Sequence, residues 1–313
     1  MVGPVKRAGG LVVDRLPDGR HVHTFRQSVV GELDTCPERG RAAMAGEIPP
    51  DESDAAALGT ACHAGFEAAA RSLLAGDPLT LPAIEEIAQD EFTRVTQQPW
   101  FRWAKYSEES CRAHISRVVE LFYDELYHQL DPIVVEWGFG PLVVHEDESR
   151  VIQIAGTVDL HDAGFGPCDY KTTEHGRTYR RGFGGDAWQL DRWAIQPTVY
   201  VEALRQAGHV DPEGPWRFTY FGFELGKEPA LHVTSVWRTP ADLRWMRDKL
   251  VSYAVLAEAG IPVWPKQDNH ALCSPKWCLH WGNCKGAHYG DWWPLRGSDD
   301  LDTVRSAVGM VGA

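Results

Sequence analysis

Residues Gly156–Lys171 read GTVDLHDAGFGPCDYK, and the expected fold follows from this stretch. Asp159 is followed ten positions later by Asp169, which opens an Asp-Tyr-Lys triplet. Two short strands joined by the glycine-rich turn would place the two aspartates side by side, where their oxygens can share a hard divalent cation. Lys171 would point to the same face as Asp169, because alternate residues of a strand share a face. A lysine there can orient or deprotonate a water molecule, or neutralise charge on a scissile phosphate. The other interpretation is a solvated polar turn, since D-x-K triplets are common.

Two further pairs of residues flank this stretch at the spacing of one helical turn. Gly59 and His63 are four positions apart in the alanine-rich segment LGTACHAGF, which has a helical pattern. Gln196 and Tyr200 are also four apart, in WAIQPTVYVEAL, and residues at this spacing share one face of a helix. Without the other motifs, His63 would be interpreted as a packed or capping histidine near a helix start.

Taken in order, these motifs resemble the RecB-type branch of the PD-(D/E)XK nucleases, which includes helicase-coupled exonucleases and the nucleases of CRISPR adaptation. The resemblance extends over about residues 22–290. Its motifs are G-x-x-x-H at Gly59–His63, G-x-x-D at Gly156–Asp159, D-x-K at Asp169–Lys171 and Q-x-x-x-Y at Gln196–Tyr200.

The resemblance implies an α/β fold of the restriction-endonuclease type, with a mixed central sheet flanked by helices. It implies Mg²⁺ or Mn²⁺ as the cofactor and Lys171 as a catalytic residue. Gln196 and Tyr200 would position the site or the nucleic-acid strand. The implied metal ligands are His63, Asp159, Asp169 and the carbonyl of Tyr170.

The cysteines indicate a second metal site. Cys273, Cys278 and Cys284 crowd together near the C-terminus, and Cys36 is the best candidate for a fourth ligand. Four thiolates suit either structural zinc or an iron–sulfur cluster. The resemblance favours [4Fe-4S], although the first gap of the C-terminal group is longer here than is usual in the family.

Histidines near the last cysteines keep zinc open as the alternative, because His280 or His288 could replace a thiolate. The three remaining cysteines stand singly in apolar or helical contexts and are expected to be buried small hydrophobes. They are Cys62, Cys111 and Cys168.

The charge of the chain supports a different class of function. The formal net charge is −13, whereas proteins that bind many phosphates are usually basic. This favours the alternative of a non-catalytic nucleic-acid-binding or assembly subunit with a structural zinc or iron–sulfur site. Arg180 and Arg181 lie between Tyr179 and Phe183, however, and basic groups among aromatic ones can grip a single strand. The alternative interpretation of that stretch is a loop whose arginines form ion pairs with nearby acidic residues.

The organisation along the chain favours one nuclease domain over residues 1–313. We expect a helical insertion at about 75–131, a catalytic core at about 132–260, and a cysteine segment at about 261–290 joined to Cys36. One helix is predicted near Ser28–Arg39, and another begins with Thr239 as its N-cap and Pro240 as its first residue.

The expected function is that of a metal-dependent DNA exonuclease acting on ends or single strands, in recombination, repair or phage DNA metabolism. No GxxxxGK[ST] phosphate loop occurs, so duplex unwinding would need a partner. DNA is the expected partner, and a helicase or a single-strand annealing protein is a further candidate. An odd count of seven cysteines, no secretory signal and no membrane-spanning apolar run favour a reducing cytoplasm without a membrane partner.

Overall fold

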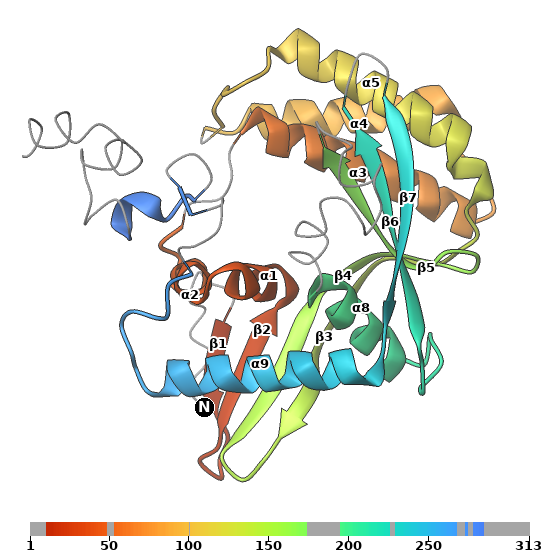
Figure 1. Cartoon of the computed structure of the whole chain (residues 1–313). Helices are drawn as coiled ribbons and strands as arrows, with labels where there is room; N and C mark the ends of the chain where they lie inside the picture. Colours follow the sequence, from red (N-terminus) through yellow and green to blue (C-terminus); the bar gives the residue numbers. More distant parts are fainter. Residues whose placement is uncertain are drawn as a thin grey trace, which may run out of the picture.

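A mixed sheet with helices on both faces forms the centre of the protein (Figure 1). The computed structural model describes residues 11–48, 53–99, 101–173, 195–225, 229–267, 273–274 and 278–284. The strands are β1 (Leu11–Arg15), β2 (His21–Arg26), β3 (Pro132–Glu146), β4 (Arg150–Asp162), β5 (Gly166–Thr173), β6 (Trp216–Glu224) and β7 (Ala230–Arg238). The α-helices are α1 (Gln27–Thr35), α2 (Pro37–Met44), α3 (Asp54–Leu74), α4 (Leu81–Thr96), α5 (Glu108–Glu125), α8 (Ile195–Gln206) and α9 (Pro240–Glu258), and short 3₁₀ turns are η1 (Tyr127–Gln129) and η3 (Trp281–Asn283). The predicted α/β class is confirmed.

The pairing of β4 creates a gap in the sheet. The strand order is β1-β2-β4-β5-β6-β7, and β3 pairs with β4 along the other edge of that strand. On the first edge, β2 runs parallel to β4 as far as Ala155, and β5 pairs antiparallel with it from Leu160 onward. Among the described strands, none pairs with residues 156–159 of β4 on this edge. The motif G-x-x-D occupies these four positions.

Two apolar cores lie on opposite faces of the sheet. One is built with α1, α8 and α9, and the other with α3, α4 and α5. Figure 1 shows α3, α4 and α5 gathered together, away from α1, α8 and α9. The second core contains an aromatic cluster in which the ring of Phe66 lies 4.4 Å from Phe122, 4.8 Å from Phe223 and 5.1 Å from Tyr170.

Helix ends follow from local sequence chemistry. The predicted start of α9 is confirmed: Thr239 and Asp242 form a capping box, and Pro240 occupies the first turn. The single helix expected near Ser28–Arg39 is wrong. It is split into α1 and α2 at Cys36, whose φ of −160° and ψ of 113° are extended. The reason is Pro37, because a proline disfavours helical geometry in the residue before it.

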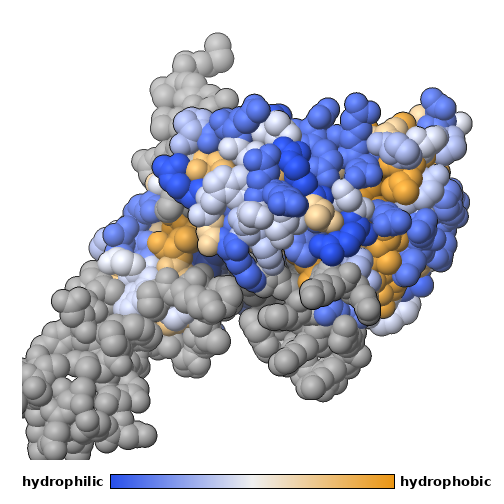
Figure 2. All heavy atoms as spheres, turned by 90° about the horizontal axis from the view of Figure 1, so that it is seen from above, coloured by the Kyte–Doolittle hydropathy of each residue, from blue (hydrophilic) through white to orange (hydrophobic). Residues whose placement is uncertain are grey.

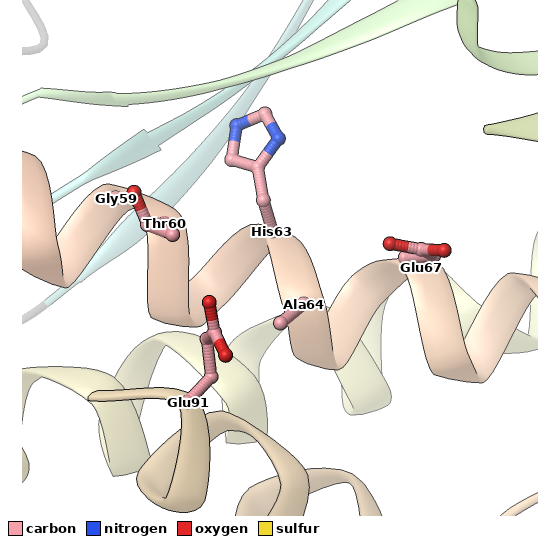
Figure 3. Close-up of a pocket in the computed structure, with 6 residues that line it drawn as sticks. All are labelled: Gly59, Thr60, His63, Ala64, Glu67 and Glu91. Carbon is pink, nitrogen blue, oxygen red and sulfur yellow. The ribbon is translucent and has the colours of Figure 1, made fainter. Parts of the chain in front are cut away.

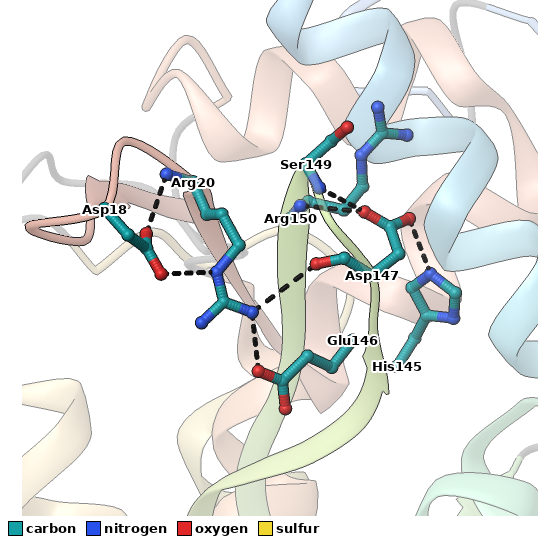
Figure 4. Close-up of polar contacts among 7 residues, drawn as sticks. All are labelled: Asp18, Arg20, His145, Glu146, Asp147, Ser149 and Arg150. Atoms are coloured by element: carbon teal, nitrogen blue, oxygen red, sulfur yellow. Dashed lines mark hydrogen bonds and ion pairs between the residues drawn. The ribbon is translucent and has the colours of Figure 1, made fainter.

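A polar cluster fixes the turn between β3 and β4 against the first hairpin (Figure 4). Asp147 Oδ1 accepts hydrogen bonds from the amides of Ser149 and Arg150, at 2.7 and 2.9 Å. Arg20, at the start of β2, donates to Glu146 Oε1 at 2.6 Å. These bonds hold the beginnings of β2 and β4 together, where their parallel ladder starts.

The face of the molecule that is seen from above is mainly polar (Figure 2). Seen from above, hydrophobic residues form separate small areas among hydrophilic ones (Figure 2). None of the helices in the described part of the chain is long and apolar enough to cross a membrane.

The side chain of Asp54, at the start of α3, binds the segment that precedes α5. Its Oδ2 accepts from the amides of Ala104, Lys105 and Tyr106 at 2.6–3.0 Å, and its side chain is buried. Asp54→Ala should lower the free energy of unfolding measured in urea by about 1–3 kcal/mol, because three hydrogen bonds to a buried carboxylate are lost. Burial alone would raise the pKa of Asp54, but these backbone amides lower it below its usual range.

The sign of the pH effect follows from that lowered pKa. A depressed carboxyl pKa in the folded state contributes stability above the unfolded pKa, near 4, which is lost as the pH falls through the folded value. The difference between wild type and Asp54→Ala should therefore shrink below about pH 4. Asp54→Asn is the matched control, since it keeps an acceptor and removes only the charge. A difference between wild type and Asp54→Ala that is independent of pH would contradict the assignment.

Candidate active site

The two aspartates lie at a fork between β4 and β5. The antiparallel ladder of these strands ends at Leu160 and Cys168. Asp159 and Asp169 are the next residue on each strand, and Asp169 already pairs with Tyr220 of β6. Two antiparallel strands that separate at this point present both carboxylates in one opening. The sequence predicted this adjacency from the turn between the strands.

Lys171 and Gln196 meet at Asp169. Lys171 Nζ lies 2.5 Å from Asp169 Oδ2 and donates to Gln196 Oε1 at 3.2 Å. The amide of Gln196 in turn donates to Asp169 Oδ1 at 2.7 Å. Because Lys171 is two residues beyond Asp169 on β5, both side chains point into the fork.

Tyr200 supplies the corresponding contact to the other aspartate. Its hydroxyl donates to Asp159 Oδ1 at 2.8 Å and accepts from Gln196 Nε2 at 3.2 Å. The two residues of the Q-x-x-x-Y motif are one turn apart on α8, so each reaches one strand of the fork. Helix α8 thereby fixes the orientation of both carboxylates.

His63 approaches from α3, on the opposite side of the sheet from α8. Its Nε2 lies 2.9 Å from the carbonyl oxygen of Tyr170, and its Nδ1 lies 3.8 Å from Asp159 Oδ2. The ring also makes an edge contact with the Tyr170 ring, at 5.9 Å between centroids. Burial lowers the pKa of His63, which favours the neutral ring that a metal ligand needs.

The electrostatics of the fork favour a cation. Burial raises the pKa of Asp159 well above its usual range, and the charge of Asp169 raises it further. Two buried carboxylates repel each other, and a divalent cation between them would relieve that repulsion. The donors present are carboxylate, carbonyl and imidazole groups, which suit Mg²⁺ or Mn²⁺.

The described side chains of the fork are bonded to one another. Among the residues that the structure describes, no group of three histidine, cysteine, aspartate or glutamate side chains is arranged to hold a metal ion. Gln196, Tyr200 and Lys171 instead take up oxygens of the two aspartates.

Glu136 is a residue near the site that sequence reasoning missed. It has a φ of +44°, the left-handed region that non-glycine residues rarely adopt. Before it, Val135 packs in the core beneath α3, and after it, Trp137 packs against the opposite core. Burial, then the charges of Glu67 and Asp169, raise the pKa of Glu136 to about 7. The available signal was a lone acid within the apolar run IVVEWGF.

The predicted strand-binding arginines cannot be placed. Arg180 and Arg181 lie outside the described residues, between the end of β5 and the start of α8.

Cys278, one of the C-terminal cysteines, lies near Cys36 and Cys284. Glu38, two residues after Cys36, accepts from the amide of Trp264 at 2.7 Å and lies 3.3 Å from His280 Nε2. These contacts hold the C-terminal segment against α2. Burial raises the pKa of the Cys278 thiol, and the neighbouring thiolates of Cys36 and Cys284 raise it further.

Two further predictions concern the cysteines: a metal site formed by four of them, and burial of the other three. Cys273 is half-buried, and the four cysteines together do not form a metal-holding group among the described residues. The prediction that three other cysteines are buried is confirmed for Cys62, Cys111 and Cys168.

The chain belongs to the PD-(D/E)XK nuclease superfamily, whose family model matches residues 25–285. It therefore has the fold of a nuclease, and such enzymes typically use Mg²⁺ or Mn²⁺. A crystal structure described as a "Putative exonuclease" from Eubacterium rectale is similar, with a TM-score of 0.45 and 14% identity. The similarity covers 78% of this chain and 85% of that one. No curated protein matches the chain significantly in sequence.

Proposed function

We propose that the protein is a metal-dependent DNA exonuclease of the RecB type that acts on DNA ends or single strands. The observation that carries the proposal is the fork between β4 and β5. Asp159, Asp169 and Lys171 converge there under the side chains of α8, with His63 on the other side. This combination of buried carboxylates, a lysine and a neutral histidine suits phosphodiester hydrolysis.

In this mechanism Mg²⁺ or Mn²⁺ would be held by Asp159, Asp169 and His63, with the carbonyl of Tyr170 as a further ligand. When bound, the ion polarises the phosphodiester and lowers the pKa of a water molecule. Lys171 holds and orients the attacking water and offsets charge that develops on the phosphate. Water adds to phosphorus, the bond from phosphorus to the leaving oxygen breaks, and that oxygen takes up a proton.

The direct test is digestion of end-labelled DNA with Mg²⁺, Mn²⁺ or EDTA. Metal-dependent shortening from the ends supports the proposal. Binding of DNA without cleavage, by a folded and metal-supplied protein, would favour the non-catalytic binding subunit that the net charge of −13 suggests.

Tyr200→Phe tests the role of α8 in orienting Asp159. The substitution removes the hydroxyl that donates to Asp159 Oδ1 at 2.8 Å and keeps the ring in the core. Loss of such a partner of a ligand typically costs about 10–100-fold in metal affinity or activity. The expected result is a higher Mn²⁺ concentration for half-maximal DNA cleavage. Val201→Ala, on the same helix but facing another apolar cluster, should leave that concentration unchanged.

We also propose that Cys36, Cys273, Cys278 and Cys284 hold a [4Fe-4S] cluster, with zinc as the alternative. The support is the proximity of Cys36 and Cys284 to Cys278 and the bonds of Glu38 to the C-terminal segment. Such a site would join the two ends of the chain, and its loss would destabilise the fold.

If the cluster is present, anaerobically purified wild type should show a broad visible absorption band, and Cys278→Ala should abolish that band and lower the yield of soluble protein. Cys111→Ala is the matched control, because that thiol is buried among apolar side chains away from the other four. Stoichiometric zinc in a colourless wild-type protein would establish the alternative.

The chain would act as one nuclease domain with a helical insertion at about 75–131, a core at about 132–260 and a cysteine segment at about 261–290. Arg180 and Arg181 would contact the strand. A helicase or single-strand annealing protein would supply open DNA in recombination, repair or phage DNA metabolism, in the cytoplasm.

A further inference from the structure

Glu136 on β3 lies across from Asp159, the aspartate that β4 contributes to the fork. The ladder pairs on either side of this position are Val135–Leu160 and Trp137–Val158. Glu136 and Asp159 are therefore the opposed residues at this level of the two strands. The pairing of β3 with β4 brings a third carboxylate beside the two of the fork, although its parent residue is far from both in the sequence.

The backbone of Glu136 is strained. Its φ of +44° lies in the left-handed region, and among the described residues other than glycine it is the one with a positive φ. Such residues persist where the surrounding structure imposes them, and they cluster at active sites. Glycine would adopt this φ without strain. The presence of glutamate here therefore indicates a role for the side chain as well as for the bend.

The carboxylate of Glu136 lacks a protein donor. In the part of the chain that the structure describes, it forms neither a hydrogen bond nor an ion pair, although the residue is partly buried. The fork aspartates differ in this respect, because Tyr200 donates to Asp159 and Gln196 donates to Asp169. A partly buried carboxylate without such donors takes its hydrogen bonds from ordered water.

Water can reach this side of the fork from a cavity along α3. His63 and Glu67 are one turn apart on α3, and both line an open cavity of about 410 Å³ (Figure 3). Burial, then the charges of Glu67 and Asp169, raise the pKa of Glu136 to about 7, so Glu136 lies close to both the cavity and the fork. Glu67 itself is ion-paired with Arg71 at 2.8 Å. Glu136 is thus the carboxylate in this region that still has acceptor capacity.

A hydrated divalent cation supplies donors of the kind that Glu136 lacks. Mg²⁺ usually keeps several water molecules when only one or two carboxylates bind it. Glu136 does not form a metal-holding group with two other described histidine, cysteine, aspartate or glutamate side chains. Contact through water therefore fits its position better than direct coordination.

We propose that Glu136 is a positioning residue of the cation site, whose carboxylate accepts hydrogen bonds from water molecules on the divalent ion held by Asp159 and Asp169. The inference rests on the proposed nuclease function. The negative charge of Glu136 strengthens binding of the ion, and its oxygens orient the bound water. Outer carboxylates of this kind typically contribute about 10–100-fold in metal affinity or activity.

The experiment measures Mn²⁺ binding to the full-length protein by electron paramagnetic resonance, without DNA and at pH 8, where Glu136 is mostly ionised. We expect Glu136→Gln to weaken Mn²⁺ binding about tenfold, because the amide keeps the size of the side chain and removes its charge. Glu148→Gln is the matched control. It makes the same change of charge in the exposed turn between β3 and β4, and it should bind Mn²⁺ as wild type does. Equal affinities of wild type and Glu136→Gln would overturn the proposal.

Glu136→Gly separates the charge from the bend. Glycine suits the left-handed backbone, so this variant should stay folded, which thermal unfolding without metal checks. We expect it to bind Mn²⁺ as weakly as Glu136→Gln does. Wild-type affinity in Glu136→Gly would mean that the bend alone serves the site, and the proposed role of the carboxylate would be wrong. This variant also decides the matter if Glu136→Gln is unfolded.

Asp169→Asn distinguishes a failure of the metal site from a failure of the role of Glu136. This substitution should abolish the tight Mn²⁺ site. No Mn²⁺ binding by wild type, or unchanged binding by Asp169→Asn, would overturn the proposed active site and the role of Glu136 with it. Loss of binding in Asp169→Asn together with wild-type affinity in Glu136→Gln would overturn only the role of Glu136.

Discussion

Lys171→Ala is expected to lower the rate of DNA cleavage by about 10²–10³-fold, the typical cost of losing one group that stabilises developing charge. Among the residues that the structure describes, Lys171 carries the one lysine or arginine cation within 2.5 Å of a fork carboxylate. The measurement is single-turnover digestion of end-labelled DNA at saturating Mn²⁺. The fold should persist, because the side chain is partly exposed and is not part of either core.

Lys249→Ala is the control for this substitution. Lys249 lies on α9, where it pairs with Asp34 and stacks over Trp245, and it has no contact with the fork. It should cleave DNA at the wild-type rate. Retention of more than a tenth of the wild-type rate by Lys171→Ala, in protein free of contaminating nuclease, would remove Lys171 from the mechanism.

Phe66→Ala is expected to lower the free energy of unfolding by about 3–5 kcal/mol, the typical cost of truncating a buried phenylalanine. The side chain is fully buried, and its ring packs against Phe122, Phe223 and Tyr170. It therefore joins α3, α5 and β6 to the strand that carries Asp169. Urea unfolding followed by circular dichroism gives the difference.

Leu74→Ala is the matched control at the end of the same helix, where the side chain is 51% exposed. Its effect should stay within about 0.5 kcal/mol. A loss below about 1 kcal/mol for Phe66→Ala would mean that the layer of α3, α4 and α5 is not anchored through this cluster. Because His63 is on the same helix, Phe66→Ala should also weaken DNA cleavage in the folded protein.

Much of the candidate site could be predicted because its residues are close in sequence or on regular elements. Asp169 and Lys171 share a strand face by the two-residue period of a strand, and Gln196 and Tyr200 share a helix face by the four-residue spacing. The glycine-rich turn after Asp159 predicts the hairpin that brings the aspartates together. The break between α1 and α2 at Cys36 also has a local cause, because Pro37 follows Cys36 in the sequence. The prediction of a single helix did not take this proline into account.

Long-range placement was not accessible in this way. The free edge of β4 over residues 156–159 depends on where β2 stops and β5 starts to pair, and these strands are more than 120 positions apart along the chain. Glu136 was also missed, because its charge and its left-handed backbone acquire meaning only beside Glu67 and Asp169.

The sequence by itself determined the chemistry of this protein: which carboxylates, lysine, histidine and cysteines are available, and which local elements carry them. Side-chain type and short-range periodicity are properties of neighbouring residues, so they can be read without a fold. Only the tertiary structure decided that α3 and α8 approach the fork from opposite sides, so that His63 and Tyr200 reach it from different helices. Those features arise from burial of apolar surface between distant segments, which no local pattern specifies.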